Sequence, residues 1–255
     1  MTVRELYTFL NEKIPPSLSC SWDNDGLMCC ANAGAGVKKV LVALDITATV
    51  VKTAIDGGYD VIISHHPLIF SPLRALNPND HVAKKVIDLL RAGVTAMSFH
   101  TRLDAVQGGV NDLLANALGL ENVAPFGQDG EEIGRIGELA GPMSVKAFAA
   151  NVRNALGAGQ VLVADAGREV KRVAVLGGSG SDDVRAAIAA GADTYLTGEL
   201  KHNYLADAPE LGINLFAAGH FDTEVPVCGR IKELLLEADA TLTVDIVSSN
   251  TVTVV

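Results

Sequence analysis

Apolar residues recur along this chain in two patterns, the three-to-four-residue spacing of amphipathic helices and the short continuous runs of buried strands. Residues 3–13 carry the helical spacing, and Pro15 and Pro16 follow it directly. Because proline cannot continue a helix, the pattern predicts one helix that ends before Pro15.

A second stretch alternates the two patterns. Residues 39–45 read as a buried strand, residues 47–57 as a helix, and residues 59–64 as another buried strand. The paired Gly57 and Gly58 are typical of a helix end. Strand, helix and strand in this order predict a βαβ unit with two parallel strands.

The same unit recurs further along the chain. A shift of 133 positions lays residues 40–67 on residues 173–200 without a gap. The identical pairs fall in the strands, on the apolar face of the helix and at its glycine end: Val40 with Val173, Val42 with Val175, Val51 with Val184, Ala54 with Ala187, Ile55 with Ile188, Gly58 with Gly191 and Asp60 with Asp193. We interpret this self-similarity as a duplicated half, with chance similarity of Ala, Val and Gly-rich units as the competing interpretation.

The two copies differ where the second strand ends. The first copy continues with His65 and His66, and the second with Gly198 and Glu199. Ligands of α/β sheets bind at the carboxyl ends of parallel strands. We therefore expect one functional site in a molecule of two lobes.

The pattern predicts an α/β fold with two related αβ lobes, each a mixed or parallel sheet flanked by helices. Residues 122–141 are rich in Gly, Glu and Gln and read as a junction. We expect residues 1–128 and 215–255 to form a discontinuous metal-binding lobe and residues 129–214 to form the second lobe. Further predictions are a helix at 144–156 and strands at 160–164, 240–247 and 251–255.

Composition narrows the class of protein. Apolar residues make up 49% and charged residues 20% of the 255 residues, which excludes a disordered chain. No window approaches a membrane span, and no signal peptide is evident, so we expect a cytoplasmic protein. The net charge of −10 argues against general nucleic-acid binding. The four cysteines lack disulfide or zinc spacing and indicate buried thiols.

Three chemically suggestive groups each follow an apolar strand. They are His65 with His66, His100 with Asp104, and His220 with Glu224. If the three strands share one sheet, the groups meet at one edge, and convergent imidazoles and carboxylates are typical of a divalent transition-metal site. Each group alone has a plainer explanation: a chance His pair, a turn cap at His100, or a carbonyl hydrogen bond from His220.

The spacing also favours two ions over one. His65 and His66 would point in opposite directions if both are extended. His220 and Glu224 are four residues apart, so a helix beginning near Gly219 places them on one face. A carboxylate such as Glu224 can bridge two metals, which together lower the pKa of a shared water and produce a hydroxide nucleophile.

The chain resembles the NIF-three-like family, also called the GTP cyclohydrolase 1 type 2 family. The markers appear in order: Ser21-Trp-Asp-Asn-Asp-Gly-Leu27, Leu44-Asp-Ile-Thr47, Ser64-His-His-Pro67, His100-Thr-Arg-Leu-Asp104, Thr197-Gly-Glu-Leu200 with His202, and Gly219-His-Phe-Asp-Thr-Glu224. The resemblance implies a toroidal homohexamer with a dinuclear metal centre. It implies metal ligands at His65, His66, Asp104, His220 and a bridging Glu224, with His100 lining the site.

The resemblance further implies a dinuclear-metal-dependent hydrolase that opens the purine ring of a nucleotide such as GTP. We expect two divalent ions per subunit (Zn, Fe, Mn or Co), a small-molecule substrate, and catalytic roles for His100 as proton shuttle and for Glu224. A metal-dependent phosphoester hydrolase and a non-catalytic metal-binding scaffold hexamer are the alternatives. Arg102 departs from the small polar residue usual in the family and could bind an anion of the substrate.

Four smaller features complete the picture. The glycine-rich segment 177–181 reads as a tight turn before a helix, with phosphate binding as the alternative. Glu199, Lys201 and His202 either face the site or are solvated. Asp45 is a candidate hydrogen-bond acceptor behind the metals. Trp22, the only tryptophan, reads as a packing residue, with the loop 23–26 near the site as the alternative.

Overall fold

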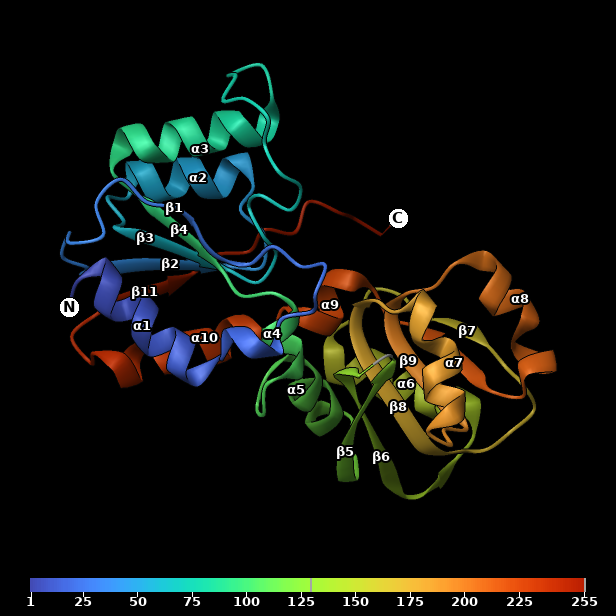
Figure 1. The fold of residues 1–255 in the computed structure, drawn as a ribbon. Coiled ribbons are helices and arrows are strands. Elements are labelled where there is room, and N and C mark those ends of the chain that lie inside the picture. The colour runs from blue at the N-terminus through green and yellow to red at the C-terminus, as the bar shows by residue number, and fades with distance from the viewer. Residues whose placement is uncertain (129, 255) are drawn as a thin grey trace. The chain divides into compact units, whose positions relative to one another are not determined.

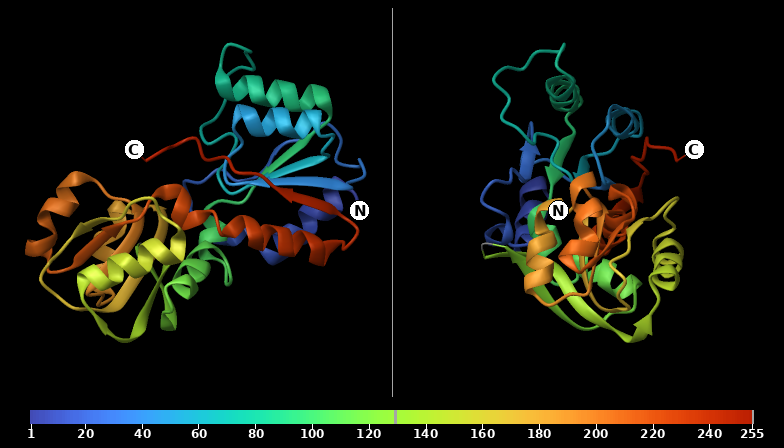
Figure 2. Two further views of the ribbon diagram at one scale, coloured as in Figure 1. Left: turned by 180° about the vertical axis from the view of Figure 1, so that it is seen from behind. Right: turned by 90° about the vertical axis from the view of Figure 1, so that its right-hand side faces the viewer.

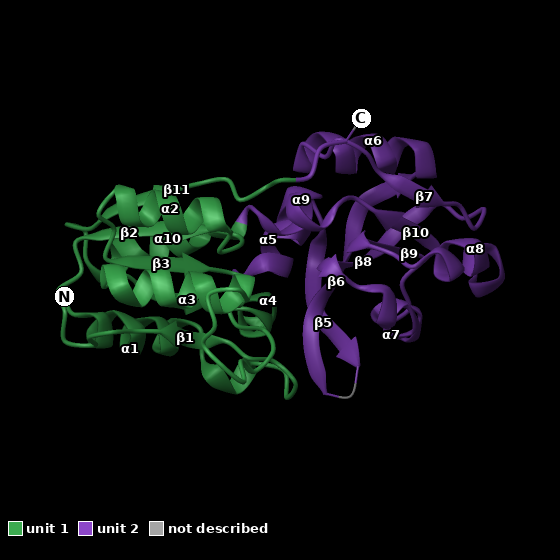
Figure 3. Cartoon of the chain, turned by 90° about the horizontal axis from the view of Figure 1, so that it is seen from above, with its two compact units in different colours: residues 1–106, 227–251 green, residues 107–226, 252–255 purple. Residues whose placement is uncertain are grey.

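The computed structural model describes residues 1–128 and 130–254, and the chain divides into two compact units (Figure 3). Unit 1 comprises residues 1–106 and 227–251, and unit 2 comprises residues 107–226 and 252–255. Each unit is a sheet flanked by helices, which confirms the predicted fold class. The unit boundaries fall after residues 106 and 226, whereas the sequence-based prediction has them after 128 and 214.

Unit 1 is built around a five-stranded sheet in the order β1-β4-β3-β2-β11. Its elements are α1 (Val3–Lys13), the 3-10 turn η1 (Pro16–Leu18), β1 (Gly26–Cys29), β2 (Lys39–Ala43), α2 (Ala48–Asp56), β3 (Val61–Ser64), α3 (His81–Ala92), β4 (Thr95–Ser98), α4 (Thr101–Ala105), α10 (Val227–Ala238) and β11 (Thr243–Ile246). All neighbouring pairs are parallel except β1 with β4.

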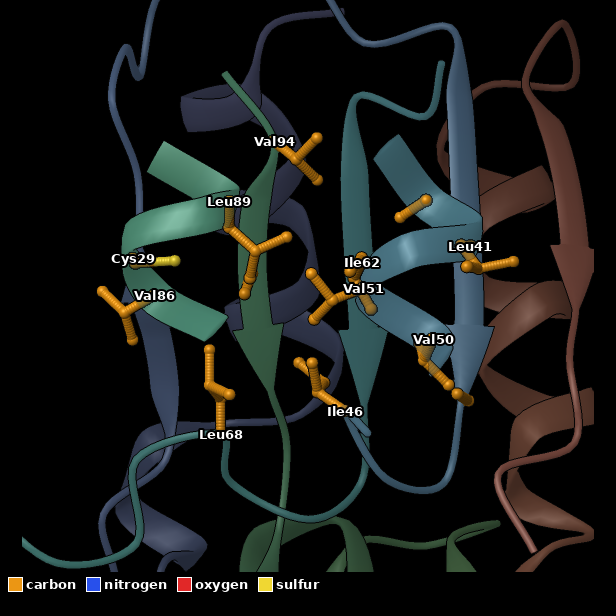
Figure 4. Packing of buried hydrophobic residues seen from close by; sticks show 13 residues of the cluster. Cys29, Leu41, Ile46, Val50, Val51, Ile62, Leu68, Val86, Leu89 and Val94 are labelled. Atoms are coloured by element: carbon orange, nitrogen blue, oxygen red, sulfur yellow. The ribbon is translucent and has the colours of Figure 1, made fainter. Parts of the chain in front are cut away.

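The helices of unit 1 cover both faces of this sheet. Helices α2 and α3 lie side by side on one face, and α1 and α10 lie on the other (Figures 1 and 2). Alternate strand residues such as Leu41 and Ile62 pack beneath α2 and α3 (Figure 4). Their neighbours Val40 and Val61 point to the opposite face and are equally buried. Burial on both faces explains the continuous apolar runs in the sequence.

Local signals place the helix ends of unit 1. Thr2 and Glu5 form a capping box at the start of α1, which spans the predicted residues 3–13. The Asp80 carboxylate caps α3, and Gly93 ends that helix in the left-handed conformation that glycine adopts readily.

Unit 2 contains a six-stranded mixed sheet in the order β5-β6-β8-β9-β10-β7. Its elements are α5 (Val110–Ala117), β5 (Glu121–Gln128), β6 (Glu131–Met143), α6 (Val145–Leu156), β7 (Leu162–Ala164), β8 (Val170–Ser179), the 3-10 turn η2 (Ser181–Asp183), α7 (Val184–Ala189), β9 (Thr194–Glu199), α8 (His202–Leu211), β10 (Asn214–Ala217) and α9 (His220–Glu224). Val173 and Val175 pack with α5 and α6, while Ala174 and Leu176 pack with α7 and α8.

The duplicated βαβ motif is visible in the strand registers. Val40 pairs with Val61 in unit 1, and Val173 pairs with Thr194 in unit 2, which is the same offset of 133 positions on both strands. Both copies of the repeat carry an aspartate that plays the same part. Asp60 accepts hydrogen bonds from the backbone N–H groups of residues 38 and 39, and Asp193 accepts them from residues 171 and 172.

The repeat extends into the following strand and short helix. Phe99 N–H donates to the carbonyl of Ser64, and Ala218 N–H donates to that of Thr197. Helix α4 follows the first pair and α9 follows the second, each five residues long. The strands of the two units therefore end in equivalent ways. The side chains that follow these strand ends differ, and they determine the chemistry of each unit.

Two sequence-based predictions are wrong. Residues 122–141 are not a junction, because they form most of the antiparallel pair β5 and β6. Their glycines serve close packing: a Cβ at Gly134 would lie 2.3 Å from the Phe126 ring. Residues 251–254 form no strand, because the alternating pattern there has no neighbouring strand to pair with in the described structure.

Within residues 1–128 and 130–254, none of the helices combines the length and the hydrophobicity that a membrane crossing requires. The four cysteines are free thiols, as the spacing predicts. Burial raises the pKa of Cys29 to about 11 and that of Cys228 to about 12. These two side chains are therefore neutral and apolar at pH 7.

Candidate metal centre

The imidazoles of His65 and His66 follow the carboxyl end of β3 and are each held by a hydrogen bond at Nδ1. His65 Nδ1 lies 3.0 Å from the carbonyl oxygen of Phe99, and His66 Nδ1 lies 2.7 Å from Asp45 Oδ1. A carbonyl oxygen only accepts, so His65 Nδ1 carries the proton. This arrangement turns Nε2 of each ring away from the hydrogen-bond partner and makes it a candidate ligand atom, and it confirms Asp45 as the acceptor behind His66.

The strand alternation does not continue through the two histidines. Strand β3 ends at Ser64, and the rings of His65 and His66 lie 4.9 Å apart between centroids rather than on opposite faces. Asp104, on the short helix α4, places Oδ1 3.8 Å from His65 Nε2. Donor nitrogens of His65, His66 and His100 all lie within 4.8 Å of one another. Unit 1 by itself thus gathers three imidazoles and one carboxylate.

His100 is bound on its other side by Asp23. The distance from His100 Nδ1 to Asp23 Oδ1 is 2.8 Å, and the backbone N–H and hydroxyl of Thr101 donate to Asp23 Oδ2. Burial of the Asp23 carboxylate opposes ionisation, but the hydrogen bonds from His100 and Thr101 outweigh burial and lower the pKa of Asp23 to about 2. Asp23 is therefore an anion that keeps the proton of His100 on Nδ1 and leaves Nε2 able to accept one.

Arg102 is a structural residue. Its guanidinium is almost fully buried, lies 2.9 Å from Asp25 Oδ2, and also donates to the Asn11 side chain and the Ile14 carbonyl. Asp25 in turn accepts from the backbone N–H of His100. The expectation that Arg102 binds a substrate anion is wrong, because the side chain is almost fully buried and its Nε and Nη1 groups already bond inside unit 1.

In unit 2, α9 carries the second predicted pair. His220 Nε2 lies 3.2 Å from Glu224 Oε2, so the four-residue spacing brings the two donors together as predicted. Glycines of the β8 end leave room for them. A Cβ at Gly178, whose φ is +67°, would lie 2.2 Å from Glu224 Oε1, and one at Gly177 would lie 3.0 Å from Glu224 Cγ.

The glycine-rich segment 177–181 is not the predicted tight turn, because residues 177–179 form the irregular end of strand β8, but its amides are used inside unit 2. The N–H groups donate to side chains of unit 2: Gly177 to Asn111, Gly178 to Thr223 and Gly180 to Thr197. Glu199 Oε1 lies 3.5 Å from His220 Nδ1, and the exposed Lys201 pairs with Asp182.

Sequence reasoning overlooked the role of Asp23 and misjudged Trp22. Trp22 is 57% exposed, so it is not a packing residue. The alternative, that the loop after Trp22 lies near the site, holds for Asp23 and Asp25. The clustered polar residues of Ser21-Trp-Asp-Asn-Asp-Gly were the available signal, because three acids or amides in a short loop need partners.

The donor set of each unit fits a divalent transition metal. Imidazole nitrogen and carboxylate oxygen suit Zn, Fe, Mn or Co, and an Nδ1 hydrogen bond behind each ligand imidazole is usual at such sites. His65 and His66 both have that bond, and His65 Nε2 and His220 Nε2 each have a carboxylate oxygen within 4 Å.

Comparison with known proteins agrees with these observations. The chain matches the family Duf34/NIF3 (NGG1p interacting factor 3) over residues 1–253. It is 31% identical over 243 residues to a GTP cyclohydrolase 1 type 2 homolog of Clostridium perfringens, covering 93% of this chain and 92% of that protein. A homolog of the same name from Methanocaldococcus jannaschii is 34% identical over 239 residues, covering 92% and 95%.

The fold agrees as well. The crystal structure of a Bacillus cereus protein related to NIF3 superimposes with a TM-score of 0.88 at 26% identity, and the match covers 100% of this chain and 99% of that one. With the family matched over nearly every residue and relatives above 30% identity covered almost end to end, this chain belongs to the Duf34/NIF3 family.

Proposed function

We propose that this protein is a dinuclear-metal-dependent hydrolase. The candidate metal ligands are His65, His66 and Asp104 in unit 1 and His220 and Glu224 in unit 2, and they would hold two divalent ions per chain. One observation carries the proposal. Each unit sets an imidazole Nε2 beside a carboxylate oxygen of the short helix α4 or α9, at 3.8 Å from Asp104 in unit 1 and 3.2 Å from Glu224 in unit 2.

The residues divide the work between binding and proton transfer. When bound, divalent ions supply the Lewis acidity that activates water and polarises a substrate oxygen. The backbone carbonyl of Phe99 and the carboxylate of Asp45 orient the ligand imidazoles. His100, held at Nδ1 by the Asp23 anion, offers Nε2 as the proton acceptor beside them.

The reaction we propose is hydrolytic opening of a purine ring. Water adds its oxygen to a ring carbon, and His100 Nε2 accepts the proton that water loses. The bond between that carbon and a ring nitrogen then breaks, and His100 returns the proton to the nitrogen. Atoms and charge balance with water as the only co-reactant. The names of the curated relatives, GTP cyclohydrolase 1 type 2 homologs, support a nucleotide such as GTP as the substrate.

We further propose that the protein works as a homohexamer in the cytoplasm. Four free cysteines, three of them buried, suit a reducing compartment. The net charge of −10 disfavours general nucleic-acid partners, whereas the divalent ions would locally favour an anionic small molecule.

Metal analysis and turnover test the proposal together. The purified protein should contain about two divalent ions per chain, and Glu224→Gln should lower this content and abolish hydrolysis of GTP while the circular dichroism spectrum stays unchanged. Glu233→Gln, at an exposed glutamate, is the matched control. Metal uptake with turnover of phosphoesters alone would favour the phosphoester hydrolase, and uptake without any Glu224-dependent turnover would favour the scaffold.

A further inference from the structure

Two aromatic side chains of unit 1 stand largely exposed next to the imidazole cluster. Trp22 is 57% and Phe70 is 56% exposed, and their ring centroids lie 6.3 Å apart. Aromatic side chains of this size normally bury most of their surface, because each removes a large apolar area from water. Two of them exposed together therefore require an explanation by function or by a partner.

Both rings contact the same imidazole. The centroid of His100 lies 6.1 Å from that of Trp22 and 6.2 Å from that of Phe70, with interplanar angles of 78° and 82°. His100 is also the ring whose centroid lies 5.2 Å from His65 and 5.7 Å from His66. The aromatic pair is thus continuous with the candidate metal ligands of unit 1.

The loops that carry the two aromatic residues are tied in place. The Asn24 side chain donates a hydrogen bond to the Ile69 carbonyl, which links the loop of Trp22 to the loop of Phe70. Asp23, between Trp22 and Asn24, is anchored to His100 and Thr101. These bonds lie next to both aromatic residues in the chain. Trp22 and Phe70 are therefore exposed on loops that hydrogen bonds fix in place.

We propose that Trp22 and Phe70 form the binding face for a planar heteroaromatic ring of the substrate. An exposed aromatic face binds such rings by stacking, which does not depend on the pattern of ring substituents. The inference rests on the proposed function, because it places the ring beside the imidazoles that would carry out the hydrolysis. It assigns ring binding to residues that are not candidate metal ligands.

The single tryptophan makes the proposal directly measurable, because all tryptophan fluorescence comes from Trp22. Guanosine 5′-monophosphate added to the full-length protein should quench this fluorescence in a saturable manner, and ribose 5-phosphate, which lacks the ring, should not. Phe70→Ala should weaken the apparent affinity at least about fivefold, the lower end of the effect of losing one stacking side chain. Leu76→Ala, at an exposed residue of the same segment, is the control and should leave the affinity unchanged.

Two outcomes would overturn the inference. One is quenching that rises linearly with concentration and only as much as for free N-acetyltryptophanamide. The other is that acrylamide quenches the fluorescence of Trp22 only after the protein is diluted. That result would mean that a second copy of the chain covers the aromatic pair. Since quenching needs neither metal nor turnover, saturable binding without hydrolysis would contradict the proposed function alone. Hydrolysis without saturable quenching would contradict this inference alone.

Discussion

The Nδ1 atom of His100 lies 2.8 Å from Oδ1 of Asp23, a carboxylate whose side chain is completely shielded from solvent. Both oxygens of Asp23 accept hydrogen bonds, Oδ1 from His100 and the Asn24 backbone, and Oδ2 from Thr101. Four donors around the two oxygens favour the ionised carboxylate. Asp23 therefore specifies the tautomer and the orientation of His100, in the way that a buried acid orients a catalytic histidine elsewhere.

Asp23→Asn should impair catalysis without removing metal. An amide must turn its NH₂ group toward one of the two sets of donors, so His100 loses its fixed tautomer or Thr101 loses its acceptor. We expect turnover to fall on the order of 10²–10⁴-fold, the usual contribution of general acid–base catalysis. Hydrolysis rates and the ¹⁵N chemical shifts of the His100 ring measure this effect. Asp56→Asn, at an exposed acid, should change neither rate nor shifts.

The lowered pKa of Asp23 predicts a stability loss in acid. The ordinary value is 3.8 and the folded-state pKa is about 2, so the stabilisation is complete well above pH 4 and is lost as pH falls toward 2. Between pH 5 and pH 3 the loss should be about 1 kcal/mol. Urea unfolding of wild type and Asp23→Asn checks this, because the difference between their free energies of unfolding should become smaller as the pH falls from 5 to 3. A gap that stays constant with pH would contradict the assigned pKa.

Arg102→Met should destabilise unit 1 strongly. Removing the guanidinium leaves Asp25 as a buried charge without its ion-pair partner, a loss of roughly 3–5 kcal/mol in free energy of unfolding. Arg172→Met is the matched control, because Arg172 pairs with Glu138 at the surface and should cost less than about 1 kcal/mol. Equal effects of the two variants in urea unfolding would argue against a structural role for Arg102.

Gly178→Ala should reduce metal binding by displacing the Glu224 carboxylate. The new methyl group would lie 2.2 Å from Glu224 Oε1 and 3.0 Å from His220 Nε2, at a φ of +67° that alanine adopts only under strain. Elemental analysis should show fewer ions per chain than in wild type. Gly141→Ala, where a Cβ meets nothing within 4 Å, should retain the wild-type metal content.

Asp60 and Asp193, the equivalent carboxylates of the two repeats, should each stabilise the folded protein. Alanine at either position leaves two backbone N–H groups without their acceptor, at a cost of roughly 1–3 kcal/mol for a buried donor. Asp193→Ala should cost more, because Asp193 is 8% exposed whereas Asp60 is only half-buried. Urea unfolding measures both variants, and Asp56→Ala, at an exposed acid, should be nearly neutral. A neutral Asp193→Ala would contradict the structural equivalence.

Local patterns predicted much of the site because its parts lie close together in sequence. The His220 and Glu224 pair follows from helix geometry across four residues, and the ends of β3 and β10 follow from short apolar runs. The role of Arg102 could not be predicted, since burial of an arginine depends on Asp25, 77 positions away. The exposure of Trp22 was equally unpredictable, because hydrophobicity alone favours burial.

The sequence by itself determined the αβ character of both units, the duplicated βαβ motif and the identity of the candidate metal ligands, because periodicity, turn residues and ligand chemistry are local properties. Only the tertiary structure decided the hydrogen-bond partners of the imidazoles. Phe99, Asp45 and Asp23 lie 34, 21 and 77 positions from the histidines that they orient. Chain topology selects such partners, since packing between strands and loops joins residues that no sequence spacing relates.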